Sequence, residues 1–230
     1  MAEPVNSETA SADTGFTRWT LPLFLTRENK YFSAILIFGF AVAAYLLSNH
    51  FPLFPPQLLP MTWLDRTIPL IPNTVWIYTS EGFLFLTVYA LCKDMANANK
   101  YLYSFLSLQI VSVIIFWIWP TTYPRDLYPI PADVNALTYY MFHNLRDVDT
   151  PGNCCPSLHV SSVYLSSFMY LDEQREKFPF FFLWATAVAV STLTTKQHYL
   201  IDVVTGLLMA VIFYWIFHRY VSYRARAPKR

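Results

Sequence analysis

Two short segments of this sequence hold residue types that can carry out acid–base and nucleophilic chemistry. Segment 153–161 reads Asn-Cys-Cys-Pro-Ser-Leu-His-Val-Ser and places His159 at the beginning of an apolar run. Segment 196–202 reads Lys-Gln-His-Tyr-Leu-Ile-Asp, in which His198 and Asp202 are four residues apart. On a helix this spacing brings the carboxylate within reach of the imidazole. Such a carboxylate fixes the tautomer of the ring and stabilises its charged form.

These groups, together with Arg125, make up the set that is needed to bind and transfer a phosphoryl group. One neutral imidazole can attack phosphorus, and a second can protonate the departing alkoxide. Arginine offers a fork of donors to the phosphate oxygens, and backbone N–H groups between Ser157 and His159 form an anion site if a helix begins there. Two other interpretations stay open. Arg125 and Lys196 can anchor the chain to membrane phosphates, and the histidines and the aspartate can bind a metal, although short ligand spacing is lacking.

The composition indicates that these groups work in or beside a lipid bilayer. Of the 230 residues, 55% are hydrophobic and only 13% are charged, about half the usual share of roughly 25%. The apolar residues fall in blocks near the span of a bilayer, which excludes disordered, fibrous and nucleic-acid-binding classes. The net charge of +1 implies no acidic partner, and three cysteines are too few for a disulfide framework, so we expect free thiols.

Six apolar segments are separated by polar or proline-rich stretches. Four have 19 residues, enough to cross a bilayer, and two shorter ones flank the charged segment 172–177. This charged segment cannot stay in hydrocarbon, so it predicts a turn between two helices. The sequence therefore predicts an all-α integral membrane protein with six transmembrane helices, at 31–49, 74–92, 101–119, 158–171, 178–195 and 199–217.

The distribution of lysine and arginine predicts the orientation of these helices. Twelve fall on one side of a six-span arrangement and four on the other, so the positive-inside rule places both termini in the cytoplasm. We expect a cytoplasmic tail at 1–30, the membrane domain at 31–220 and a basic cytoplasmic tail at 221–230. Both chemical clusters then lie on the extracytoplasmic side, where 134–145 is expected to form a short interfacial helix. The short loops favour a bacterial inner membrane.

The two clusters together resemble the motifs of a known family. The run Pro-Ser-Leu-His at 156–159, followed by Ser191, His198 and Asp202, is similar to the second and third motifs of the type 2 phosphatidic acid phosphatase (PAP2) superfamily, written PSGH and SRxxxxxHxxxD. The ending Thr-Lys-Gln-His-Tyr-x-x-Asp is more similar to the branch that contains inositol phosphorylceramide synthases. The resemblance covers roughly residues 75–215. It implies a six-helix PAP2-like bundle with an extracytoplasmic site.

The resemblance also implies a role for each residue. His198 would be the nucleophile that becomes phosphohistidine, Asp202 its partner, and His159 the general acid for the leaving group. Ser157 and Arg125 would be phosphate ligands. No metal or other cofactor is required in the mechanism of that family.

The chain departs from the family pattern at two cations. Ile118 stands where the first motif, KxxxxxxRP, has its lysine, and Thr192 stands where the third motif has its arginine. Lys196, two residues before the predicted nucleophile, is expected to replace at least one of them as a phosphate ligand. Glu81 is expected either to bond a neighbouring helix inside the bundle or, like Ser191, to support the predicted phosphate ligands.

Three classes of function compete on these grounds. The leading prediction is a lipid phosphate phosphatase in which water releases the phosphohistidine, because the compact chain shows no segment dedicated to a second lipid. The alternative is a phospholipid headgroup transferase, similar to inositol phosphorylceramide or sphingomyelin synthases. The third is an ion or proton channel or transporter. The ionisable groups argue against this class because they cluster at the ends of the spans. The expected partners are a phosphorylated lipid and membrane lipids, without nucleic acid.

Overall fold

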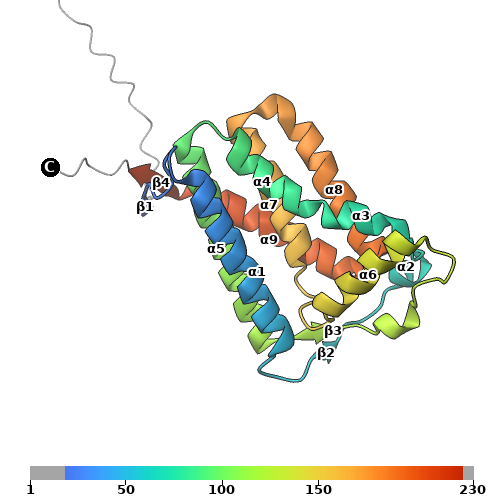
Figure 1. The fold of residues 1–230 in the computed structure, drawn as a ribbon. Helices are drawn as coiled ribbons and strands as arrows, with labels where there is room; N and C mark the ends of the chain where they lie inside the picture. The colour runs from blue at the N-terminus through green and yellow to red at the C-terminus, as the bar shows by residue number, and fades with distance from the viewer. Residues whose placement is uncertain (1–18, 225–230) are drawn as a thin grey trace, which may run out of the picture.

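The computed structural model describes residues 19–224, and most of them lie in a bundle of helices (Figure 1). Residues 1–18 and 225–230 of the two predicted tails lie outside the described residues. The bundle consists of α1 (Lys30–His50), α3 (Val75–Thr79), α4 (Glu81–Leu91), α5 (Met95–Ile118), α7 (Leu158–Glu173), α8 (Phe178–Thr194) and α9 (Leu200–Arg219).

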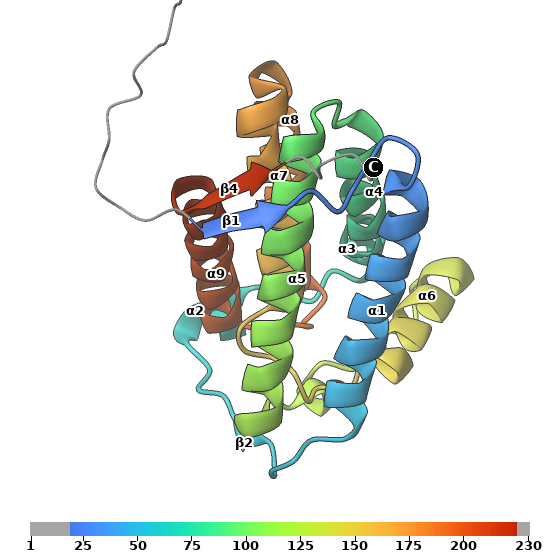
Figure 2. The same ribbon diagram turned by 90° about the vertical axis from the view of Figure 1, so that its left-hand side faces the viewer.

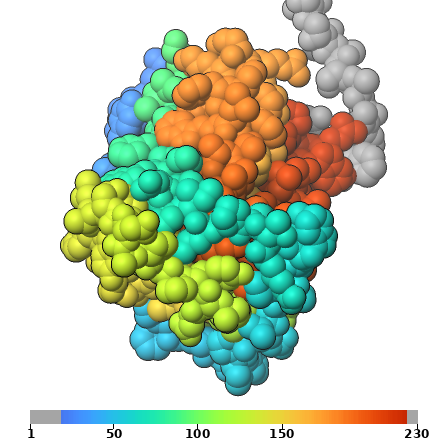
Figure 3. Space-filling view, turned by 90° about the vertical axis from the view of Figure 1, so that its right-hand side faces the viewer, coloured from blue at the N-terminus to red at the C-terminus, as the bar shows by residue number. Residues whose placement is uncertain are grey.

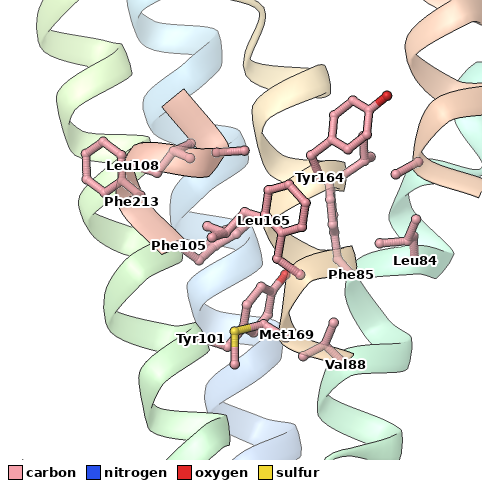
Figure 4. Packing of buried hydrophobic residues seen from close by; sticks show 14 of the residues in the cluster. Leu84, Phe85, Val88, Tyr101, Phe105, Leu108, Tyr164, Leu165, Met169 and Phe213 are labelled. Atoms are coloured by element: carbon pink, nitrogen blue, oxygen red, sulfur yellow. The ribbon is translucent and has the colours of Figure 1, made fainter. Parts of the chain in front are cut away.

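Helix α7 lies in the middle of the bundle, where it packs against α4, α5, α8 and α9. Every residue from Val160 to Tyr170 is buried, and four of them are serines, whose small side chains let neighbouring helices approach closely. Figure 4 shows Leu165 of α7 among apolar side chains of the surrounding helices, including Phe105 of α5 and Phe213 of α9. This packing fixes the first turn of α7, which carries one of the predicted catalytic histidines.

The helices fall where the six predicted spans lie, but two of these segments differ from a single long apolar helix. Segment 74–92 is broken at Ser80 into α3 and α4, and α7 has only 16 residues. The break falls at the polar run Ser80-Glu81-Gly82. The Ser80 hydroxyl donates to the carbonyl oxygen of Ile77 at 2.6 Å and accepts from Trp184 Nε1 at 2.8 Å. Among the described residues, four helices are long and apolar enough to cross a membrane: α1, α5, α8 with the turn before it, and α9.

Irregular segments cover the end of the bundle that carries the two histidines, called here the histidine end. They contain β2 (Gln57–Leu58), paired in parallel with β3 (Thr121–Thr122), and the short helices α2 (Trp63–Thr67), η1 (Pro72–Thr74), η2 (Arg125–Leu127) and α6 (Ala136–Val148). Figure 3 shows the teal and yellow-green parts of these segments over this end. The expected interfacial helix is α6, whose start is set by the Asn135 side chain capping Thr138 N.

The opposite end of the bundle is closed by the two ends of the described chain. Strand β1 (Trp19–Pro22) pairs in parallel with β4 (Val221–Arg224), as Figure 2 shows. Part of each predicted tail is therefore a strand. The charged turn 172–177, with η3 (Arg175–Lys177), lies near loop 93–94, because Glu173 Oε1 accepts from Lys93 N at 2.6 Å.

Candidate active site

The two predicted catalytic histidines lie beside each other at the histidine end. His159 is the second residue of α7, and His198 lies in the loop just before α9. The distance from His159 Nδ1 to His198 Nε2 is 3.5 Å. The two helix starts are tied together because Ser157 N donates to the carbonyl oxygen of Asp202 at 3.1 Å.

Close contact between α7 and α9 depends on Gly206. A Cβ atom at this position would lie 2.6 Å from the backbone oxygen of Ser157 and 3.1 Å from Val160 Cβ. Real Cβ atoms do not approach backbone that closely, so only glycine lets the first turn of α7 sit against α9. The distance between the two histidines is therefore set by the packing of these two helices.

His198 is held through its Nδ1 atom. Nδ1 lies 3.0 Å from the carbonyl oxygen of Cys154 and 3.3 Å from Asp202 Oδ2. Two oxygen acceptors at this nitrogen assign the proton to Nδ1, which leaves a lone pair on Nε2. Asp202 Oδ2 is itself fixed by the N–H of Tyr199 at 2.8 Å. The predicted pairing of His198 with Asp202 is thus present, with the unprotonated nitrogen facing His159.

His159 is held through its other nitrogen by a second carboxylate. Its Nε2 lies 2.7 Å from the hydroxyl of Tyr78 and 3.3 Å from Glu81 Oε1. Of the two roles considered for Glu81, bonding a neighbouring helix inside the bundle is the one that the structure shows. The first residue of α4 reaches α7 because the chain breaks at Ser80.

Asp149 also belongs to this cluster, although no motif pointed to this residue. Tyr45 and Tyr78 both donate hydroxyl hydrogen bonds to its carboxylate, the second at 3.3 Å. Arg125 bonds the Asp149 carbonyl through Nη1 and lies 3.8 Å from Oδ2 through Nη2. Asp149 lies 104 residues after Tyr45 and 71 residues after Tyr78, so no local motif could connect them.

Arg125 is buried and bonded to Tyr123 and Asp149 within this cluster, which uses only part of its N–H donors. Its Nε also lies 3.4 Å from the hydroxyl of Tyr123. Burial disfavours the charge, but the neighbouring Tyr123 and Asp149 outweigh it and raise the pKa of Arg125 above its ordinary value. The arginine therefore stays charged, and it is linked to His159 through Asp149 and Tyr78.

The structure does not bring the ammonium group of Lys196 to the histidines. Lys196 has a positive φ of 56°, and its Nζ donates to the carbonyl oxygens of Asp65 at 2.7 Å and Ile68 at 2.6 Å. Burial lowers its pKa. The side chain thus fastens segment 65–68 to the loop that carries His198, and Asp65 in turn caps α9 by accepting from Leu200 N at 2.8 Å.

The two predicted serines lie at helix ends. Ser157 is the N-cap of α7, where its hydroxyl accepts from Val160 N at 3.3 Å. Its backbone position gives the N–H groups of the first turn an orientation towards the histidine end. Ser191 lies in the last turn of α8, and its hydroxyl donates to the carbonyl of Val188 at 2.6 Å.

Cys154 and Cys155 are free thiols, as is Cys92. Both members of the pair are buried, and burial raises the pKa of each above its ordinary value. Within the described residues, no group of three His, Cys, Asp or Glu side chains is arranged to hold a metal ion.

A cavity of about 130 Å³ reaches His159 from within the bundle. Its walls come from α1, α4, α5 and α7 and are mostly apolar, with Phe38, Val42 and Phe85 among them. Glu81 and His159 contribute polar groups to the lining. The cavity therefore joins an apolar space to one of the two histidines.

The comparisons with known proteins agree with the motifs around these histidines. A family model described as the PAP2 superfamily matches residues 54–216, which include both histidines and, except for Tyr45, the residues that bond them or their partners. The part of the cavity wall that comes from α1 precedes the match. A search of curated proteins gives no match.

Proposed function

Because this chain belongs to the PAP2 superfamily, we propose that it is a membrane-embedded lipid phosphate phosphatase that works through a phosphohistidine. The observation that carries the proposal is the 3.5 Å distance between His159 Nδ1 and His198 Nε2, with a carboxylate at the far nitrogen of each ring. One ring is prepared to attack and the other to transfer a proton. We assign the predicted roles to these two residues on this basis.

In the first step, His198 Nε2 attacks phosphorus and the bond from phosphorus to the lipid oxygen breaks. The electron pair of that bond goes to the lipid oxygen, which takes a proton from His159 Nδ1. Asp202 and the Cys154 carbonyl keep the proton on His198 Nδ1 and stabilise the positive charge that develops on the ring. Glu81 stabilises the protonated His159 through Nε2.

In the second step, water attacks the phosphohistidine and the bond from phosphorus to Nε2 breaks. His159 now removes a proton from the water, and inorganic phosphate leaves. We propose that the backbone N–H groups after Ser157 and the guanidinium of Arg125 stabilise the phosphate oxygens. Lys196 acts in this proposal by holding segment 65–68, since two carbonyls occupy its ammonium group.

We further propose that all six bundle segments cross the membrane, with α3 and α4 together forming one of them. The positive-inside rule then places both termini in the cytoplasm and the histidine end outside, in a bacterial inner membrane. The exposed apolar side chains on the outer faces of α1 and α8, such as Phe32 and Leu183, support contact with lipid.

A headgroup transferase is the second candidate, and the cavity beside His159 is the observation that favours it. A lipid alcohol entering from the membrane would place its hydroxyl near this histidine, where water otherwise attacks. With a phosphodiester lipid as donor, His198 attacks phosphorus, diacylglycerol leaves with the proton from His159, and the headgroup phosphate stays on His198. The alcohol then attacks this intermediate, so that a new phosphodiester is formed instead of inorganic phosphate.

Purified protein in detergent tests these proposals with a panel of phosphatidic acid, phosphatidylglycerophosphate, an isoprenyl diphosphate and phosphatidylinositol. We expect inorganic phosphate from at least one of the first three lipids, with EDTA present. Formation of a new phospholipid after addition of ceramide or diacylglycerol, without phosphate release, would replace the phosphatase by the transferase. No reaction with any of these lipids would refute both.

A further inference from the structure

A buried glutamine lies inside the apolar part of the bundle with only part of its hydrogen-bonding capacity used. Gln109, in the middle of α5, is 4% exposed, and its Nε2 donates to Ser162 Oγ of α7 at 3.0 Å. A side-chain amide has two N–H donors and an oxygen with two lone pairs. The oxygen of Gln109 accepts no hydrogen bond from any residue between 19 and 224. This oxygen is not among the fully buried unpaired side-chain atoms of the described residues, so it is open to the cavity that Gln109 lines.

The position of the pair explains the free oxygen better than helix packing does. One interhelical hydrogen bond would account for the amide nitrogen but not for the unpaired oxygen. Gln109 and Ser162 both line the cavity that contains His159. Ser162 follows His159 by three residues on α7, so it lies on the same face, about 4.5 Å farther along the axis. The pair is therefore a polar part of the cavity lining one helical turn along α7 from the histidine, in addition to Tyr45 and Glu81.

Aromatic and aliphatic side chains surround this polar surface. Figure 4 shows two of these wall residues, Phe85 and Phe105, which come from α4 and α5. Phe38 and Val42 of α1 line the same cavity and are 40% and 41% exposed, so the cavity borders the outer face of α1. A ligand with a phosphate, an adjacent hydrogen-bonding group and an apolar chain would match a histidine, a polar pair and an apolar wall.

We propose that Gln109 and Ser162 form a subsite for an ester or amide group of the lipid, which makes a glycerolipid or sphingolipid phosphate the substrate class rather than an isoprenyl phosphate. The proposal rests on the proposed function at His159 and His198. Glycerolipids and sphingolipids carry an ester or amide on the carbon next to the one that bears the phosphate. The N–H of an amide can donate to Gln109 Oε1, and a carbonyl can accept from the Ser162 hydroxyl or the second amide hydrogen of Gln109.

Isoprenyl phosphates carry only hydrocarbon at the corresponding carbon. Their binding would leave the polar pair covered and unpaired, which corresponds to about a 10-fold or greater loss of affinity. The subsite thus discriminates by the cost of an unsatisfied polar group rather than by the length of the chain.

The test compares dioleoyl phosphatidic acid, its dialkyl ether analogue and farnesyl phosphate as substrates in detergent. We expect KM to be about 10-fold lower for the diester than for the other two, with a similar kcat. Gln109→Leu and Ser162→Ala should remove most of this preference and leave hydrolysis of water-soluble p-nitrophenyl phosphate unchanged. Ser166→Ala is the matched control, because it removes a hydrogen bond to Tyr101 on the same pair of helices without lining the cavity.

Thermal unfolding of the protein, measured with each lipid, tests binding at the subsite separately from catalysis. Diester should stabilise the wild-type protein more than ether or farnesyl phosphate does, and Gln109→Leu should cancel the difference. Equal KM values and equal stabilisation by all three lipids would overturn the subsite. Stabilisation that follows the expected order without any phosphate release would instead refute the proposed function and retain the subsite.

Discussion

His198 and His159 differ in what holds the nitrogen that points away from the other ring. A carbonyl and a carboxylate hold Nδ1 of His198, whose side chain is 4% exposed, and leave its Nε2 free, whereas Tyr78 and Glu81 hold Nε2 of His159. We therefore expect His198→Ala to abolish turnover and any acid-labile phosphoenzyme. Asp202→Asn should lower kcat by about 10⁴-fold with the fold intact, because the wrong tautomer is then favoured. Rapid-quench detection of labelled phosphoenzyme checks both. Full activity of His198→Ala would contradict the mechanism.

Glu81 is expected to act on His159 and not on the nucleophile. Glu81→Gln removes the charge that stabilises the protonated ring, so transfer of a proton to the leaving oxygen should slow by about 10² or more. The loss should be largest for phosphatidic acid and smallest for an aryl phosphate, whose leaving group needs little protonation. Asp172→Asn, at the opposite end of the bundle, is the control, since its carboxylate pairs with Lys100. An equal loss for both leaving groups would rule out this role.

The residues that could be predicted from sequence are those whose partners are close in the chain. His198 and Asp202 are one helical turn apart, and His159 follows a recognisable helix start. Asp149, Tyr78 and the contact of Glu81 arise from tertiary packing across tens of residues, so spacing carried no information about them. Lys196 stood at a plausible distance in sequence, but its left-handed backbone leads to the 65–68 carbonyls.

At the level of elements, the contact of α7 with α9 sets the distance between the histidines. Gly206→Ala would place a Cβ 2.6 Å from the Ser157 carbonyl, so the helices must separate. We expect a loss of about 1–3 kcal/mol in the free energy of unfolding and a clear fall in kcat. Gly39→Ala in α1, where a Cβ meets nothing within 4 Å, should stabilise by about 0.5–1 kcal/mol and leave kcat unchanged. Equal effects of both variants in thermal unfolding and activity assays would argue against this account.

The positions of the helices could be predicted from the lengths of the apolar segments. Where a helix differs from its predicted segment, the cause is local. Segments 31–49, 178–195 and 199–217 match α1, α8 and α9 within two residues at each end. Segment 74–92 contains a single charge and therefore resembles one span, but that charge is Glu81, which begins α4 and bonds His159. A mean hydropathy over the whole segment conceals one charged residue, whereas in the structure the helix is interrupted next to this residue.

For the whole molecule, the charge count can be tested by labelling from outside the cell. Cys154 and Cys155 are buried and have raised pKa values, so few of their thiols are ionised at neutral pH and we expect them to resist an impermeant thiol reagent. Reporter cysteines are therefore needed at exposed positions. Leu127→Cys in η2 lies at the histidine end, and Glu176→Cys lies in the turn at the opposite end.

Intact cells should label Leu127→Cys and spare Glu176→Cys until the membrane is permeabilised. The physical reason is that the lysines and arginines of the 172–177 turn and of the ends of the chain favour the cytoplasm. The unsubstituted protein, treated in parallel, reports any reaction of the native thiols, which should increase only when the pH is raised towards their elevated pKa values. Labelling of Glu176→Cys alone in intact cells would invert the topology. The two histidines would then meet their lipid from the cytoplasmic leaflet, with the same chemistry acting on substrates made on that side.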